Sequence, residues 1–268
     1  MTVDELVASL LGEYPVDSAE PWDHVGLSVG DPAASIAGVA VALDATTDSL
    51  RAAREVGANV LVTHHPVYIK APDMFAPNDS SRPCSSAVVY EAARTGVSII
   101  SLHTNLDRSL AARNRLCDMI GISRHSSLEF PADSASIGLG AVGEVPRNSL
   151  EALTARCADV FDTMPRAWGD PASPVTRVAV LGGSLGSFGE FALAAGADAI
   201  VCGEAGYHIC QDLAARGCAV VLLGHDRSEE PFVDILANSI KRAGVDAEAI
   251  HTIDSPAQWW TYTKGESS

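Results

Sequence analysis

Several features are scarce or absent in this sequence. No apolar run approaches the roughly 20 residues that a membrane-spanning helix requires, and the first residues carry acids where a signal peptide carries bases. Both absences predict a cytoplasmic protein without a membrane partner. Positive charge is also scarce, because 18 Lys and Arg stand against 34 Asp and Glu, for a net charge of −16. An acidic surface repels the phosphate backbone, so nucleic acid is disfavoured as a partner.

Familiar cysteine and nucleotide motifs are missing as well. The six cysteines form no C-x-x-C pair and match no zinc module, which predicts a reducing compartment and structural thiols. Cys202 alone adjoins a candidate site. The glycine-rich run 182–186 lacks the lysine of a P-loop, so it is either a phosphate cradle at a helix start or a tight turn.

The sequence does contain short β-branched runs that alternate with Ala-rich helical patterns. Apolar residues make up 47% of the chain and charged residues 19%, as in a globular protein. Strands are predicted at Gly38–Leu43, Val60–Thr63, Val97–Leu102, Val178–Leu181, Ala199–Cys202 and Ala219–Leu223. Helices are predicted at Val3–Leu11, Asp48–Val56, Ser85–Arg94, Ala111–Ile120, Leu150–Phe161, Ser187–Ala195, Gln211–Arg216 and Pro231–Ala243. The alternation predicts an α/β protein with mostly parallel or mixed sheets.

The two halves of the chain resemble each other. The β-α-β pattern of Val39–Val62 aligns without a gap on Val178–Val201, and a glycine ends the helix in both. This favours two similar α/β lobes that face one another, residues 1–125 and 126–268, with a C-terminal segment able to pack back on the first. Any two β-α-β units would share part of this likeness. The stretch Ser123–Arg177, with its Gly, Pro and Ser, is predicted to connect the halves.

Potential metal ligands follow three predicted strands. They are His64 and His65 after Val60–Thr63, His103 and Asp107 after Val97–Leu102, and His225 and Glu229 after Ala219–Leu223. Ligands of parallel α/β sheets bind beyond the carboxyl ends of the strands, so these side chains can meet in one crevice between the lobes. The chain has only eight histidines, so four at such positions are a specific signal.

The residue types suit a pair of metal ions. Imidazoles and carboxylates fit zinc first, with iron, manganese, nickel or magnesium as alternatives. His64 and His65 diverge in an extended chain, so they would reach different ions if the chain turns there. A carboxylate could bridge two ions roughly 3.5–4 Å apart. The two carboxylates leave part of the metal charge unbalanced, which favours a hydroxide and a small anionic or nucleotide-like substrate.

Each residue has a simpler interpretation when it is taken alone. The His64–His65 pair could be a hydrogen-bonded surface feature, Asp107 could cap the helix Ala111–Ile120, and Glu229 could complement a helix dipole. Together these interpretations explain poorly why all of the potential ligands follow strands.

The motifs resemble those of the NIF-three-like dinuclear metal-centre family, whose members are called GTP cyclohydrolase 1 type 2 homologues. The matching segments, in family order, are Pro21–Leu27, Thr63–Pro66, His103–Asp107, Gly182–Ser184, Gly203–Glu204 with Tyr207–His208, and Gly224–His225 with Glu229. The resemblance implies metal ligation by His64, His65, Asp107, His225 and Glu229, with Glu229 as a bridge. It also implies two divalent ions per chain, two similar lobes and a homohexameric ring.

Two residues depart from the family pattern: the first bears on hydrogen bonding near the site and the second on the substrate. His24 replaces an Asn, and Gly206 stands where a Lys often precedes Tyr-His, which removes a cation that could hold an anion.

The leading functional hypothesis is a metal-dependent hydrolase. His103 or His208 would shuttle protons and Glu204 would order water or substrate, and the family name suggests opening of the purine ring of GTP. The alternatives are a non-catalytic metal-binding scaffold or metal-handling protein that acts through partners, and a ring that binds nucleic acid, which the negative charge opposes.

Overall fold

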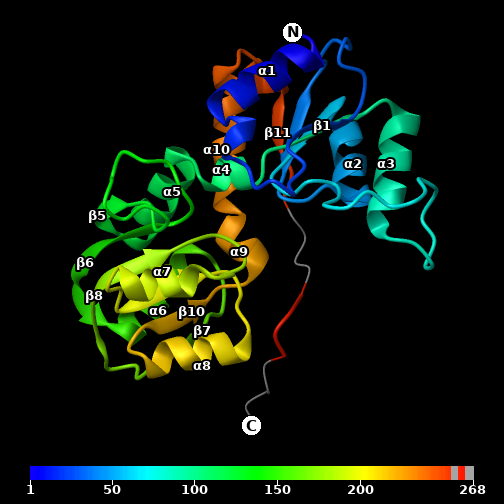
Figure 1. Cartoon of the computed structure of the whole chain (residues 1–268). Coiled ribbons are helices and arrows are strands. Elements are labelled where there is room, and N and C mark those ends of the chain that lie inside the picture. Colours follow the sequence, from blue (N-terminus) through cyan, green and yellow to red (C-terminus); the bar gives the residue numbers. More distant parts are fainter. Residues whose placement is uncertain (255–258, 263–268) are drawn as a thin grey trace.

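Two β-sheets with helices on their faces organise the chain (Figure 1). The computed structural model describes residues 1–254 and 259–262. Within this described part, no helix combines the length and the apolar composition that crossing a membrane would need. The predicted fold class, α/β with two lobes and mixed sheets, is confirmed.

The first sheet has the strand order β1-β4-β3-β2-β11. Its strands are β1 (Gly26–Val29), β2 (Val39–Ala42), β3 (Val60–Thr63), β4 (Ser98–Ser101) and β11 (Ile250–Thr252). All are parallel except β1, which runs antiparallel to β4. The three central strands are buried along their whole length. Their sequences are therefore largely apolar and do not alternate between apolar and polar residues.

Helices cover both faces of the first sheet. They are α1 (Val3–Glu13), α2 (Thr47–Glu55), α3 (Cys84–Thr95) and α10 (Pro231–Arg242). Because successive side chains of a strand point to opposite faces, Val39 and Val41 pack with α1 and α10, whereas Ala40 packs with α2 and α3. Helix α10 and strand β11 therefore bring the C-terminal part of the chain back to the first sheet.

The second sheet has the strand order β5-β6-β8-β9-β10-β7. Its strands are β5 (Ser123–Ser126), β6 (Ala141–Ser149), β7 (Arg166–Trp168), β8 (Pro174–Val180), β9 (Ala199–Cys202) and β10 (Ala219–Leu222). The three parallel strands β8, β9 and β10 lie in the middle, and antiparallel strands flank them on both sides.

The helices of the second sheet also divide between its faces. They are α5 (Leu110–Ile120), α6 (Leu150–Val160), α7 (Phe188–Ala194) and α8 (Tyr207–Ala215). Helices α7 and α8 pack on one face through Ala192 and Leu213, while α5, α6 and α10 share one continuous hydrophobic cluster with the other face and with the first sheet. The two lobes thus share a core. Short 3-10 turns occur at Val16–Ser18 and Ala247–Ala249.

The predicted strands and helices are present, although α8 begins at Tyr207 rather than Gln211 and β8 at Pro174 rather than Val178. The prediction of a connection over Ser123–Arg177 was wrong, because β5, β6, β7 and the start of β8 lie there. These flanking strands are partly exposed and polar, so they lack the apolar run by which buried strands are recognised. The division into domains at residue 125 stays a prediction.

Candidate metal centre

Six side chains, which we call the His–carboxylate cluster, meet between the two sheets, beyond the carboxyl ends of parallel strands. They are His64, His65, His103, Asp107, His225 and Glu229. The first sheet contributes His64 and His65 directly after β3, and His103 and Asp107 from the segment after β4, which includes the short helix α4 (Thr104–Asp107). The second sheet contributes the last two from α9 (His225–Glu229), where a spacing of four residues places both on one helix face.

The carboxylate of Glu229 lies at the middle of this cluster. Its Oε1 is 3.7 Å from Nε2 of His64. Its Oε2 is 2.8 Å from Nε2 of His65 and 3.2 Å from Nε2 of His225. Nε2 of His64 is in turn 3.5 Å from Oδ1 of Asp107. The two oxygens of one carboxylate therefore face two separate groups of potential ligands.

Two of these atoms are buried without a hydrogen-bond partner. They are Nε2 of His64 and Oδ1 of Asp107. Leaving a buried polar atom unsatisfied costs about 1–3 kcal/mol, and a native site retains such atoms only for a reason. Donor atoms of His64, Asp107 and Glu229 lie within 4.8 Å of one another, as do those of His65, His225 and Glu229. These donors have the type and the spacing to hold metal ions.

Each histidine of the cluster is held through its Nδ1 atom. Nδ1 of His64 lies 3.0 Å from the carbonyl oxygen of Leu102. Nδ1 of His65, His103 and His225 lies within 3.0 Å of a carboxylate oxygen, and the partners are Asp44, Asp23 and Glu204, respectively. When Nδ1 carries the proton and donates it, the lone pair of Nε2 faces the cluster, which is the arrangement of metal-binding histidines.

Asp44 should tune metal affinity without touching the metal. Asp44→Asn removes the charge that orients His65, so we expect affinity for the ion at His65 to fall about 10–100-fold. Competition titration with a chromophoric chelator measures the change. Asp48→Asn, which alters an exposed carboxylate of α2 paired with Arg51, is the matched control and should leave affinity unchanged. Equal affinities for both variants would contradict this role.

The charges around the cluster also favour cations. Every ion-pair partner of its carboxylates, and of Asp23, Asp44 and Glu204, is a histidine; among the described residues no Lys or Arg pairs with them. Without a metal, the negative charge of these carboxylates favours protonation of the histidines. Burial disfavours charge on His65, but its bonds to Asp44 and Glu229 outweigh burial and raise its pKa to about 10. The bond to Glu229 raises the pKa of His225 to about 9.

The pKa values of the two cluster carboxylates, Asp107 and Glu229, shift in opposite directions. Burial, together with the charge of Glu229, raises the pKa of Asp107 to about 7. Burial acts against charge on Glu229 too, but its bonds to the histidines outweigh it and hold its pKa well below the usual range.

The glycine-rich run 182–186 forms a turn against the cluster. A Cβ atom at Gly183, whose φ is +64°, would lie 2.3 Å from Oε1 of Glu229, so only glycine allows this close approach. The backbone N–H of Gly183 donates to Oγ of Ser228, and that of Leu185 to the carbonyl of Glu204. These bonds favour the turn over the phosphate cradle.

The simpler interpretations of single residues do not fit the structure. Ser109, not Asp107, caps helix α5. Glu229 is the last residue of α9, but it is buried among histidines rather than exposed. His208 is exposed on α8 and lines a different hollow with Gly186 and Ser187, so its role as a proton shuttle stays a prediction that this placement does not support.

Two other residues singled out in the sequence do not belong to the groups of potential metal ligands. The thiol of Cys202 is buried in β9, and burial raises its pKa. The ring of His24 packs edge-on against Tyr68.

Sequence reasoning missed three residues near the cluster. Asp44 follows the carboxyl end of β2, the same rule that found the other residues, and Asp23 lies in the quoted segment Pro21–Leu27. Arg166 belongs to the unpredicted strand β7 and had no signal.

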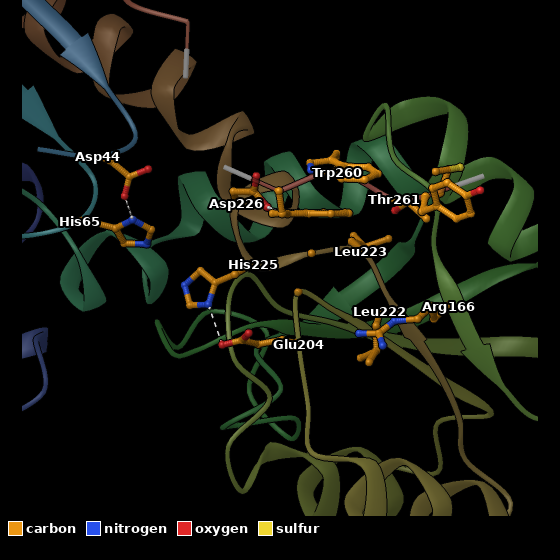
Figure 2. Close-up of a pocket in the computed structure, with 15 residues that line it drawn as sticks. Asp44, His65, Arg166, Glu204, Leu222, Leu223, His225, Asp226, Trp260 and Thr261 are labelled. Atoms are coloured by element: carbon orange, nitrogen blue, oxygen red, sulfur yellow. Dashed lines mark hydrogen bonds and ion pairs between the residues drawn. The ribbon is translucent and has the colours of Figure 1, made fainter. Parts of the chain in front are cut away.

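A pocket of about 710 Å³ opens beside the cluster (Figure 2). His65 and His225 line one end with their partners Asp44 and Glu204, and Arg166 lies at the other end. The lining also includes Trp259, Trp260, Thr261 and Tyr262 of the C-terminal tail.

The fold and the cluster define an α/β protein with His and carboxylate groups that can hold metal ions. The chain belongs to the Duf34/NIF3 (NGG1p interacting factor 3) family, whose model matches residues 1–256. The resemblance found from the motifs is thereby confirmed.

Individual relatives agree with this assignment. A Clostridium acetobutylicum protein named GTP cyclohydrolase 1 type 2 homolog is 30% identical over 233 residues, 85% of each chain. A crystal structure of a Staphylococcus aureus hypothetical protein covers 98% of this chain and 99% of its own, with a TM-score of 0.86 and 22% identity. A Bacillus cereus protein related to NIF3 has the same coverage and TM-score with 17% identity. These two structures show the fold.

Proposed function

We propose that the His–carboxylate cluster holds two divalent metal ions and that the protein is a metal-dependent hydrolase. The observation that carries the proposal is the position of Glu229, whose two oxygens face two groups of donors. His64 and Asp107 would complete one position, and His65 and His225 the other. The donors contain nitrogen and oxygen but no thiolate, which suits zinc first and then iron, manganese, nickel or magnesium.

The metal pair, when bound, would supply Lewis acidity and lower the pKa of water. The chain's own residues prepare the site for this chemistry. The side chain of His64 is fully buried and that of Glu229 is 4% exposed, so bulk water is excluded from one side of the cluster. His65 and His225 lie where the cluster meets the pocket, so a substrate in the pocket would meet that side.

Two further residues have positions that suit proton handling. A ring nitrogen of His103 lies within 4.8 Å of His64 and His65, and Asp23 accepts a bond from its Nδ1 atom, which favours a proton at Nδ1. Glu204 lines the pocket and is half-exposed, so its carboxylate can accept a proton from water or substrate while it orients His225.

Single replacements should separate the two metal positions. We expect the protein to bind two ions per chain, whereas Asp107→Ala and His225→Ala should each bind one, because each removes a donor from one group only. Elemental analysis of the purified proteins gives the stoichiometry. Two ions in both variants would refute the assignment of ligands.

Catalysis needs a separate test, because the alternative is a non-catalytic metal-binding scaffold or metal-handling protein. The metal-loaded protein should turn over a member of a panel of nucleotides, phosphoesters and cyclic amides, and the Asp107→Ala variant should not. Reversible metal exchange without any turnover would favour the scaffold. Assembly into a homohexameric ring, which the family resemblance implies, stays a prediction for sedimentation analysis.

A further inference from the structure

Most charged side chains that line the pocket beside the cluster have a hydrogen-bond or ion-pair partner within the protein, and for Asp226 that partner is a neutral indole. Asp44 binds His65, Glu204 binds His225, and Oδ1 of Asp226 accepts a bond of 2.9 Å from the indole N–H of Trp259. Arg166 is the exception: its guanidinium has no hydrogen-bond or ion-pair partner among the residues that the structure describes. Arg166 is therefore the one Lys or Arg side chain among the described residues of the pocket lining, and it is exposed and available to a ligand.

The backbone fixes the position of Arg166. Strand β7 pairs antiparallel with β10, and Arg166 lies directly opposite Leu222 in the register. Leu222 ends β10, three residues before His225 in the chain. Since β10 leads into α9, Arg166 lies on the strand next to the one that leads to His225 and Glu229. Arg166 and His65 lie at opposite ends of the same pocket (Figure 2).

Aromatic rings form another wall of this pocket. Trp259 is anchored by Asp226 and lies against Gly224, where a Cβ atom would approach the indole to 2.7 Å. Trp260 and Tyr262 are 80% and 75% exposed, and their rings are 6.4 Å apart. Exposed, stacking-competent rings beside an unpaired cation are typical of sites for flat, negatively charged ligands.

The geometry points to a ligand that carries an anionic group and a planar ring. The guanidinium of Arg166 pairs with the anion, the ring lies against Trp260, and the rest of the ligand reaches toward His65 and His225. A planar guanidinium suits a phosphate or carboxylate because it can donate two parallel bonds. This inference rests on the proposed function and names the substrate class of the same site.

Binding of two matched probes tests this inference. Adenosine monophosphate and adenosine share the ring, and only the first carries an anion. We expect the metal-loaded protein to bind the monophosphate at least about tenfold more tightly, which corresponds to about 1.4 kcal/mol. In Arg166→Ala this preference should vanish while metal content stays at the wild-type value. Calorimetry gives the affinities, and Arg147→Ala, an exposed arginine of β6 outside the pocket lining, is the control.

Two variants of Trp260 test the aromatic wall separately. Trp260→Ala should weaken both probes, and Trp260→Phe should restore most of the affinity because it keeps a ring. A preference for the monophosphate that persists in Arg166→Ala would overturn the inference, since the metals alone would then hold the phosphate. Equal binding of the two probes by the wild-type protein would overturn it too. In both outcomes metal content and turnover are measured independently, so the proposed function is judged separately.

Discussion

Glu229→Gln is expected to leave the protein nearly free of metal. The substitution keeps the shape of the side chain but removes the charge shared by both groups of donors. Loss of a residue that only orients a ligand costs about 10–100-fold in affinity. Loss of the shared carboxylate should cost at least about 100-fold at each position, in contrast to the single ion lost from Asp107→Ala or His225→Ala. Elemental analysis after dialysis distinguishes these outcomes.

The neighbouring residue provides the control for this experiment. Glu230 is a glutamate of intermediate exposure, and its carboxylate does not belong to the cluster. Glu230→Gln should therefore keep two ions per chain. If Glu229→Gln also kept two ions, the carboxylate would not be the bridge, and the proposed dinuclear centre would have to be abandoned.

Removal of metal from the wild-type protein should lower its thermal stability substantially. Each bound ion contributes about 4 kcal/mol to the folded state when the free ion exceeds its dissociation constant 1,000-fold. For a chain of this size each kcal/mol shifts the melting temperature by about 2–4 °C. We therefore expect a fall of at least about 8 °C for each ion removed on chelation. Without metal, Nε2 of His64 and Oδ1 of Asp107 are buried and lack a hydrogen-bond partner, which lowers stability further.

Differential scanning calorimetry with and without a chelator measures this shift. The Glu229→Gln variant is the internal control, because a protein that holds little metal should melt at the same temperature in both conditions. Equal melting temperatures for metal-loaded and stripped wild-type protein would show that the cluster contributes nothing to folding through metal.

The sequence predicted the parts of the fold that are buried on both sides. Strands such as β3 and β9 read as apolar runs because helices cover both of their faces, and their bounds agree with the structure. Strands β5 and β7 flank their sheet, and β7 has only three residues. Pairing with a neighbour determines such strands more than their own residues do, so periodicity could not reveal them.

The same contrast applies to the cluster. Residues that follow a recognised parallel strand could be predicted to converge, and the structure brings His64, Asp107 and Glu229 together. Which oxygen faces which imidazole depends on the packing of α9 against the first sheet, a contact between distant parts of the chain. The lining of the pocket by Arg166 depends on the register of β7 on β10, which no local pattern encodes.

The C-terminal tail has a consequence for how ligand preference can change. After β11 ends at Thr252, residues 259–262 lie outside both sheets and line the pocket. Trp260 and Tyr262 are exposed, so replacing them removes little buried surface and disturbs no strand pairing. Substitutions at these two positions should therefore change what the pocket accepts while the buried residues of the His–carboxylate cluster and the strand pairing of both sheets stay intact.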